Sequence, residues 1–316
     1  MRILITGASG FIGSYVVREA IARGHDVLAL TRSSPANKLD HVSSVQWLQC
    51  DLRDPQAPKL DGLRVDAVIH LAAGLLGSAE EQHRSTVVAT RNLLEAMRRA
   101  GITRLVGVSS IAVLDYARVP AMTLIDENVR TPPDNTGMGT YAAMKLEQEK
   151  LFAAFAGEPG RRCIVLRPGL VYDSEHLIDA RAGIVKGPLR LIAAHGGEVP
   201  TVEVTGLAKA ILNAVEREFA DAEVINLVDD NLPSQREYVA GLRRRGILTS
   251  RGIPVPWRLL AAIAFSLRVL FRVAGQAARL PEVLLWQGFA ARLKPFRYSN
   301  DKAKRLLDWV PTNRFI

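Results

Sequence analysis

Residues 3–13 read ILITGASGFIG, and this stretch decides the fold. The apolar run Ile3–Thr6 has the composition of a buried strand, and a helical pattern follows the glycines Gly7, Gly10 and Gly13. In such a turn the first glycine permits the tight bend, the second lets main-chain N–H groups approach a pyrophosphate, and the third lets helix and strand pack closely. The stretch therefore predicts a dinucleotide site at the positive end of a helix.

Short β-branched runs alternate with helical patterns through the first half of the chain, which is typical of a parallel sheet with crossover helices. The predicted strands are Ile3–Thr6, Asp26–Thr31, Val45–Gln49, Ala67–Leu71, Arg104–Ser109, Cys163–Arg167 and Glu223–Val228. The predicted helices are Phe11–Ala22, Glu81–Ala100, Tyr141–Phe155 and Leu207–Glu218. We predict an α/β fold, a Rossmann-type doubly wound parallel sheet with a smaller, mostly helical C-terminal substrate lobe.

The regular alternation loosens in residues 173–200, where Gly, Pro and His are frequent. A helix and a strand follow as late additions to the same sheet, and the remainder of the chain has a helical pattern. We therefore expect a dinucleotide-binding domain of residues 1–172 and 201–232. Residues 173–200 and 233–316 are expected to form the substrate-binding lobe.

The composition is that of a globular protein, because 48% of the 316 residues are apolar and 23% are charged. The two cysteines, Cys50 and Cys163, imply no disulfide framework, and no export segment is visible at the N-terminus. We therefore expect a cytoplasmic protein. No metal is predicted, because metal-ligand spacing is lacking among His70, His83, His176 and His195.

The net charge of +9 comes from the last quarter of the chain, where 16 Lys and Arg stand against 4 Asp and Glu from Arg236 onward. Such an excess fits an anionic substrate, a membrane surface or nucleic acid, and it equally fits a solvated helical face. Neither a recognition helix nor an aromatic platform accompanies it. We therefore expect no nucleic-acid partner.

The end of the second predicted strand distinguishes the two nicotinamide dinucleotides. An acidic residue there binds the ribose diol, whereas a basic residue accepts a 2′-phosphate. The segment has no carboxylate and carries Arg32, which favours NADP(H), with NAD(H) as the alternative if Arg32 is only a solvent-facing loop residue. Asp51, after the third strand, is placed to accept a hydrogen bond from the adenine amino group.

A catalytic pattern follows farther along the chain. Tyr141 and Lys145 are four residues apart, so on a helix they project from one face. An ammonium close to a phenol stabilises the phenolate, which would lower the pKa of Tyr141 and let it shuttle a proton. Ser110, just beyond a strand, would hydrogen-bond the substrate oxygen. Alone, such a pair is usually a surface feature, and its order after the glycine turn makes it specific.

Together these motifs resemble the extended short-chain dehydrogenase/reductase superfamily, which is also described as NAD-dependent epimerase/dehydratase-like. The resemblance covers nearly the whole chain and is carried by residues 6–13, 70–73 (HLAA), 109–110, 141–145, 166–172 (LRPGLVY) and 302–311. It implies that Tyr141 is the acid/base and that Lys145 also holds the nicotinamide ribose. It further implies that Ala72 and Ala73 border the cofactor and that the segment after Pro168 flanks the nicotinamide.

The complete predicted site combines these assignments. The catalytic residues are Ser110, Tyr141 and Lys145. The cofactor-binding residues are Gly7, Ser9, Gly10, Phe11, Ile12, Gly13, Arg32, Asp51, Leu52, Leu71, Ala72, Ala73, Tyr141, Lys145 and Pro168.

Two departures from the family pattern bear on function. Thr86 stands where the family commonly has an asparagine, which puts the structural or proton-relay role of that group in doubt. Residues 199–206 read VPTVEVTG and lack the arginine with which nucleotide-sugar members grip a pyrophosphate. This weakens the epimerase interpretation, although arginines of the C-terminal part could substitute.

The segment 256–272 is unusually apolar and carries arginines at 258, 268 and 272. It is too short and too charged to span a bilayer. It either lies in a membrane interface, as a peripheral contact, or covers the substrate pocket, and both interpretations favour a substrate with apolar surface. A homodimer through 81–100 and 141–155 is a further expectation from the resemblance.

The leading hypothesis is an NAD(P)-dependent oxidoreductase that transfers a hydride between nicotinamide and a carbinol or ketone carbon of a fairly apolar small molecule. The first alternative is a nucleotide-sugar epimerase or dehydratase that uses the same Ser110, Tyr141 and Lys145. The second alternative is a non-catalytic NAD(P)-binding protein, against which the intact Ser-Tyr-Lys set argues.

Overall fold

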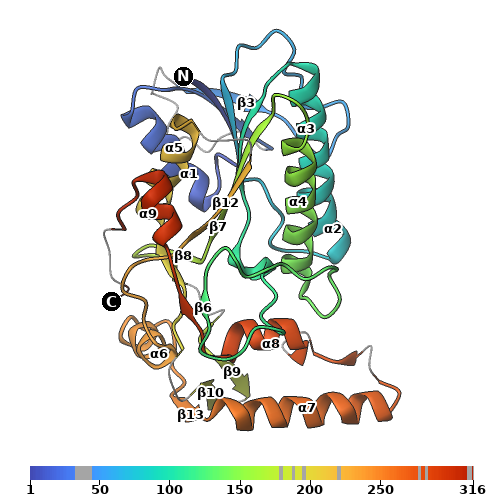
Figure 1. Cartoon of the computed structure of the whole chain (residues 1–316), viewed down its shortest axis with the longest axis vertical. Helices are drawn as coiled ribbons and strands as arrows, with labels where there is room; N and C mark the ends of the chain where they lie inside the picture. Colours follow the sequence, from blue (N-terminus) through green and yellow to red (C-terminus); the bar gives the residue numbers. More distant parts are fainter. Residues whose placement is uncertain are drawn as a thin grey trace.

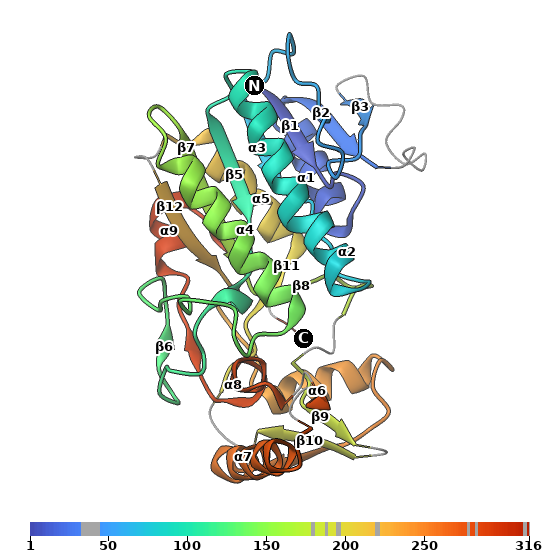
Figure 2. The same ribbon diagram turned by 90° about the vertical axis from the view of Figure 1, so that its right-hand side faces the viewer.

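The computed structural model describes residues 1–32, 45–177, 181–186, 189–193, 197–218, 222–276, 279–281, 284–311 and 315. Figures 1 and 2 show an elongated molecule with a large sheet and its covering helices at one end and a smaller group of helices and strands at the other. His195, one of the histidines considered as a metal ligand, lies outside the described residues.

A seven-stranded parallel sheet forms the larger part, with the order β12-β7-β5-β4-β1-β2-β3. Its strands are β1 (Arg2–Thr6), β2 (Asp26–Thr31), β3 (Val45–Gln49), β4 (Ala67–His70), β5 (Arg104–Val108), β7 (Arg162–Pro168) and β12 (Ala222–Leu227). All seven predicted strands and the predicted fold class are confirmed. The strand order reverses at β1, which lies between β2 and β4, and ligands of such sheets bind in the crevice at this reversal.

Helices cover both faces of the sheet (Figures 1 and 2). One face carries α1 (Phe11–Ala22), α5 (Val204–Glu216) and α9 (Asp301–Leu307); the other carries α2 (Ala79–His83), the π-helical turn η1 (Arg84–Val88), α3 (Ala89–Arg99) and α4 (Thr140–Ala156). Alternate residues of β1 therefore enter different cores. Ile3 and Ile5 pack on the α1 side, and Leu4 packs on the α3 side.

The predicted helix over 81–100 is interrupted by η1. Within this turn the carbonyl of Thr86 accepts a hydrogen bond from the Thr90 hydroxyl at 2.6 Å. The Thr86 hydroxyl accepts one from the Gly74 amide at 2.9 Å. Single π-helical turns are common at functional sites, and this one brings Thr86 to the loop that follows β4.

The C-terminal part contains helices α6 (Gln235–Arg244), α7 (Trp257–Val273) and α8 (Trp286–Leu293). It also contains a small sheet, β13-β10-β9, that the sequence did not predict. Its strands are β9 (Ile184–Lys186), β10 (Leu189–Ala193) and β13 (Gly252–Val255). These strands are short, and Pro254 in edge strand β13 is a residue that argues against a strand when only the sequence is considered.

Short strand pairs and the C-terminal residues tie the two parts together. Strand β8 (Leu170–Tyr172) pairs with β11 (Thr201–Glu203), and β6 (Leu124–Ile125) pairs with β14 (Arg297–Tyr298). Residues 301–309, which the sequence pattern assigned to the substrate-binding lobe, pack beside α5 in the core of the large sheet. There the Trp309 indole donates to the Gly206 carbonyl at 2.8 Å.

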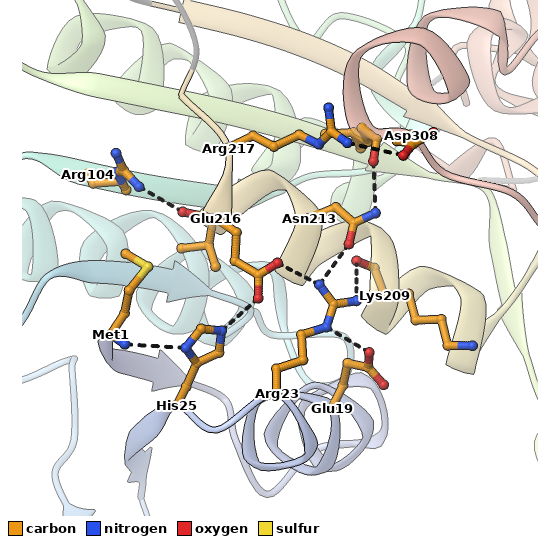
Figure 3. Close-up of polar contacts among 12 residues, drawn as sticks. Met1, Glu19, Arg23, His25, Arg104, Lys209, Asn213, Glu216, Arg217 and Asp308 are labelled. Carbon is orange, nitrogen blue, oxygen red and sulfur yellow. Dashed lines mark hydrogen bonds and ion pairs between the residues drawn. The ribbon is translucent and has the colours of Figure 1, made fainter.

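A partly exposed polar cluster joins α1 to α5 at the amino ends of the strands (Figure 3). The Arg23 guanidinium donates to Asn213 at 2.7 Å and to Glu216 at 2.8 Å. His25 contacts the same Glu216 carboxylate at 2.7 Å. We call Arg23, His25, Asn213 and Glu216 the amino-end cluster.

Candidate active site

A cleft of about 300 Å³ opens at the carboxyl ends of β1, β2, β3 and β4. Most of the predicted cofactor residues line it: Gly7, Ser9, Gly10, Phe11, Ile12, Gly13, Arg32, Asp51, Leu52, Leu71, Ala72 and Ala73. Residues that sequence reasoning missed also line it: Leu30, Thr31, Cys50, Arg53, Leu75, Ser85 and Ala89. The structure thus brings four strand ends, those of β1 to β4, and the N-terminus of α1 around one cavity.

The glycine turn after β1 has the geometry that a bound pyrophosphate needs. Gly7 has a φ of +68°, and a Cβ there would lie 2.9 Å from the Ala72 amide nitrogen. A Cβ at Gly13 would lie 2.1 Å from the Gly7 carbonyl oxygen. Only glycine therefore lets α1 start this close to β1, with its N-terminal amides facing the cleft. The residues present fit a dinucleotide.

Two arginines lie at the end of the cleft formed by β2 and β3. Arg32 is exposed at the end of β2, and Arg53 donates to both carboxylate oxygens of Asp51, with its Nε at 2.9 Å from each. The bond from Arg53 lowers the pKa of Asp51, and the charge of Arg32 contributes in the same direction. The sequence signal that could have identified Arg53 is its position, two residues after Asp51 and just beyond the third strand.

Ser110 and Tyr141 meet where β5 ends and α4 begins. Ser110 follows β5, Tyr141 lies in the first turn of α4, and the Ser110 side chain is close enough to the phenol to affect its pKa. Burial raises the pKa of Tyr141, and the nearby Ser110 side chain opposes this. The sequence spacing predicted that Lys145 lowers the phenol pKa. That expectation is wrong, because the ammonium bonds to Val108 and Gln148 instead.

Lys145 lies one helical turn later and is only 4% exposed. Its ammonium donates to the Val108 carbonyl and to the Gln148 side-chain oxygen, both at 2.8 Å. Burial lowers the pKa of Lys145 to about 8, and the nearby charge of Glu149 opposes the shift. An ammonium held in this way is kept inside the protein rather than in solvent.

Tyr141, Lys145 and Pro168 do not line the 300 Å³ cleft. Pro168 ends β7, which is the neighbour of β5 in the sheet, so the carboxyl ends of β5 and β7 lie side by side. These three residues therefore belong to the next stretch of the same sheet edge. A dinucleotide with its phosphates at the glycine turn would extend its nicotinamide toward them.

A second cavity, of about 220 Å³, lies in the C-terminal part. Four cationic residues line it: Arg181, Arg236, Arg292 and Lys294. Glu198 adds a carboxylate to the same wall. Arg181 also contacts the ring of Tyr116, which follows the Ser110 loop, with its guanidinium 5.5 Å from the ring centroid. The cavity is thus an electropositive pocket connected to the loop that carries Ser110.

The described residues offer candidates neither for a metal site nor for a membrane span. No group of three or more His, Cys, Asp or Glu side chains gathers there as a metal site would require. No helix in that part of the chain combines the length and apolarity that crossing a bilayer needs.

Residues 3–227 match the NAD dependent epimerase/dehydratase family. The 2-alkyl-3-oxoalkanoate reductase of Stenotrophomonas maltophilia (strain K279a) is 31% identical over 336 residues, which cover 98% of this chain and 95% of the reductase. A UDP-glucose 4-epimerase of Streptomyces lividans is 29% identical over 283 residues, covering 81% and 82% of the two chains.

The fold is also similar to solved structures. The UDP-glucose 4-epimerase of Thermus thermophilus, in complex with NAD, matches with a TM-score of 0.70 and 22% identity, covering 99% of this chain and 95% of the other. A nicotinamide dinucleotide is therefore the cofactor of the matching family and of this structural neighbour.

Proposed function

The chain belongs to the NAD dependent epimerase/dehydratase family, and from that premise we propose that it is an NADP(H)-preferring reductase or dehydrogenase for a largely apolar ketone or alcohol. It is an NAD(P)-dependent oxidoreductase of the extended short-chain type. One observation carries the proposal: the Ser110 side chain lies beside the Tyr141 phenol at the end of β5, and Lys145 is fixed one turn farther along α4.

The three side chains divide the chemistry. The bound cofactor supplies or accepts a hydride at its nicotinamide ring. In the reducing direction Ser110 hydrogen-bonds the substrate oxygen, and Tyr141 donates its phenolic proton to that oxygen as the carbonyl carbon gains the hydride. Lys145, held by Val108 and Gln148, would position the nicotinamide ribose. In the oxidising direction Tyr141 takes the proton back.

The preference for NADP(H) rests on Arg32 and Arg53, which present two guanidinium groups beside the cleft at the ends of β2 and β3. A 2′-phosphate would bring negative charge there, and β2 ends without a carboxylate to bind a ribose diol. Arg32→Asp is expected to weaken NADPH binding by about tenfold or more and to leave NADH binding unchanged or improved. Equal losses for both cofactors would contradict the preference.

The apolar substrate is supported by the similarity to the 2-alkyl-3-oxoalkanoate reductase and by the apolar α7. Purified protein and NADPH are mixed in separate reactions with a long-chain 3-oxo acid, a sterol ketone or a UDP-sugar. Nicotinamide absorbance measures reduction, and chromatography of the sugar nucleotide detects epimerisation, which leaves that absorbance unchanged. We expect reduction of the alkyl ketone. Turnover of the UDP-sugar alone, by protein that retains NAD(H) through purification, would contradict the proposal.

Helix α7 also supports a peripheral membrane contact. It lies at the far end of the molecule from the large sheet, across the long axis (Figure 1). Its exposed apolar side chains are Leu259, Ile263, Phe265, Val269, Leu270 and Val273. The exposed Arg258 and Arg272 belong to the same helix, so an apolar surface is combined with cations that match anionic headgroups. We propose that this face rests on an anionic membrane in the cytoplasm.

Sedimentation with vesicles tests the membrane contact. Binding to phosphatidylglycerol-containing vesicles is expected to exceed binding to phosphatidylcholine vesicles and to fall about tenfold or more in Leu270→Glu, because α7 would then bury a charge. Val310→Glu is the matched control, since Val310 is an exposed apolar residue away from α7. If Leu270→Glu changes the oligomeric state and not vesicle binding, a second copy of the chain covers α7 instead.

We also propose a homodimer through the face formed by residues 81–100 and 141–155, where α3 and α4 lie side by side (Figure 2). Ala153 and Ala154 on α4 are small and exposed, which permits close approach of a second helix. Light scattering is expected to report a dimer for the natural chain and a monomer for Ala154→Glu. A natural chain that stays monomeric at high concentration would contradict this interface.

The electropositive pocket favours one second candidate, a nucleotide-sugar epimerase. Arg181, Arg236, Arg292 and Lys294 could take the pyrophosphate for which residues 199–206 lack an arginine. Calorimetry with UDP separates the two candidates. Micromolar binding that is lost in Arg236→Glu would favour the epimerase, and absence of binding would favour the reductase.

A further inference from the structure

We propose that Gln148 and Thr90 are positioning residues for the catalytic ammonium of Lys145, held in a buried hydrogen-bond chain that runs to the cofactor turn. The inference rests on the proposed function, because it assigns Lys145 a catalytic task. We call Lys145, Gln148, Thr90, His70 and Thr6 the buried chain.

Its first half joins α4 to η1 and α3. The Lys145 ammonium donates to the Gln148 carbonyl oxygen at 2.8 Å, and the Gln148 amide nitrogen donates to the Thr90 hydroxyl at 2.8 Å. The Thr90 hydroxyl donates its own proton to the Thr86 carbonyl at 2.6 Å. Gln148 and Thr90 are both 0% exposed, so water does not compete for these bonds.

The second half crosses the sheet to β1. His70 lies with Nε2 at 2.9 Å from the Thr90 hydroxyl and with Nδ1 at 2.6 Å from the Thr6 hydroxyl. The Thr6 oxygen is 3.3 Å from the Ala72 amide, which donates to it. Ala72 lines the cofactor cleft. The buried chain thus connects Lys145 to a residue that lines the cofactor cleft.

The proton positions follow from donor and acceptor counts. Lysine has no acceptor, so the Gln148 oxygen must face Lys145 and its nitrogen must face Thr90. The Thr90 proton is already given to Thr86, so Thr90 accepts from both Gln148 and His70. His70 therefore carries its proton on Nε2 and accepts the Thr6 proton on Nδ1.

A neutral histidine is required by this arrangement. A proton on Nδ1 would face the Thr6 hydroxyl proton, which would then lose its acceptor. Burial lowers the pKa of His70 to about 3, and the charge of Lys145 contributes in the same direction. The geometry and the electrostatics thus agree on a neutral His70. The hydrogen bonds of the buried chain therefore have one donor–acceptor arrangement rather than several.

Two of the three Lys145 N–H donors are fixed by Val108 and Gln148. The third is left for the nicotinamide ribose. The other ionisable groups near Lys145 are His70 on β4, Tyr141 and Glu149 on α4, and Arg167 on β7. Arg167 holds the Glu149 carboxylate by two bonds of 2.6 and 2.8 Å. Gln148 is accordingly the side-chain acceptor that, together with the Val108 carbonyl, sets how readily Lys145 keeps its proton.

Two substitutions of Gln148 that are expected to shift the pKa of Lys145 in opposite directions test this positioning role. Protein labelled with ¹³C at the lysine side chains is titrated by NMR without cofactor, and the Lys145 signal is assigned by its absence in Lys145→Met. The natural chain should titrate near pH 8. Gln148→Glu places a carboxylate beside the ammonium and should raise the midpoint by about 1–3 units. Gln148→Leu removes the acceptor and should lower it by about one unit.

The pH dependence of activity should shift in the same directions as the Lys145 titration. The alkaline limb of kcat/KM for NADPH is expected to move up in Gln148→Glu and down in Gln148→Leu, because kcat/KM reports groups of the free enzyme. Thr90→Val should lower kcat about tenfold or more, and Thr90→Ser, which keeps the hydroxyl, should restore it. Asn213→Leu, which removes a side-chain amide from the amino-end cluster, is the control. It should lower the melting temperature and should move neither the NMR titration midpoint of Lys145 nor the alkaline limb of kcat/KM.

The outcomes separate the two proposals. If Lys145 titrates at the natural midpoint in both Gln148 variants, Gln148 is only a packing residue and the inference is overturned. If the Lys145 midpoints shift as expected in the two Gln148 variants, but the natural chain transfers no hydride, the proposed function fails and the positioning role of Gln148 stands.

Discussion

The buried chain and the amino-end cluster join distant segments of the same sheet by different physical means. The buried chain lies at the carboxyl ends of β1 and β4, is almost completely buried, and contains one charged group, Lys145. The amino-end cluster lies where these strands begin, and its ion pair leaves 23% of the Arg23 side chain and 33% of the Glu216 side chain exposed (Figure 3).

The contrast shows where polar groups determine stability in this protein. Water screens the amino-end cluster, so each ion pair there contributes about 1 kcal/mol or less. Inside the sheet edge water cannot replace a lost partner, so an orphaned group costs about 1–3 kcal/mol, and more if it is charged. The site is consequently the region where single polar substitutions should have the largest effects.

The largest effect is expected for the buried ion pair beside the chain. Glu149→Gln would leave Arg167, whose side chain is 8% exposed, as an uncompensated buried cation. The free energy of unfolding should fall by about 3–5 kcal/mol in urea titrations. Glu147→Gln, two residues earlier and 32% exposed in its side chain, should change it by less than about 1 kcal/mol. Equal losses of unfolding free energy in the two variants would remove the distinction between buried and partly exposed ion pairs.

An acid-sensitive loss of stability is expected from His70. Its pKa falls from an ordinary 6.5 to about 3 on folding, so between these values the unfolded chain binds a proton that the folded chain does not. Stability should therefore decrease as the pH falls from about 6.5 toward 3, by about 1.4 kcal/mol per pH unit from this group.

The variant His70→Gln isolates that contribution. It should be less stable at neutral pH by about 1–3 kcal/mol, because Thr6 or Thr90 loses its partner. Its unfolding free energy should also depend less on pH below 6.5 than that of the natural chain. Parallel pH profiles for the two proteins would mean that His70 is not kept neutral by the fold.

The smallest effect is expected in the amino-end cluster. Glu216→Gln should lower the free energy of unfolding by less than about 1 kcal/mol, because the carboxylate is one-third exposed. That difference should shrink further at high salt, where the charges are screened. A loss as large as that of Glu149→Gln would show that exposure does not explain the contrast.

The main sheet was predictable because its strands are short apolar runs separated by turn signals, and parallel pairing follows from the intervening helices. The ordered motifs at Gly7, Ser110 and Tyr141 placed the candidate site, because the carboxyl ends of parallel strands share one edge. The assignment of catalytic and cofactor roles to these residues stays a prediction.

Other features depend on contacts that no local pattern encodes. Gln148 and Thr90 are 58 residues apart, and only the packing of α4 against η1 and α3 makes them partners. The small sheet around β10 consists of short strands with a proline at its edge, which resemble loops in the sequence. The raised pKa of Tyr141 likewise follows from burial, which the spacing to Lys145 does not reveal.

The most direct measurement of the central claim is deuteride transfer from [4-²H]NADPH by the natural chain and by Tyr141→Phe, with NADPH binding measured in parallel. The account predicts that the natural chain moves deuterium onto the carbonyl carbon of an alkyl ketone, which becomes the carbinol carbon of the product. Tyr141→Phe should bind NADPH as tightly yet transfer about 10²–10⁴ times more slowly, the usual contribution of a general acid. Transfer at the natural rate by Tyr141→Phe would contradict the account.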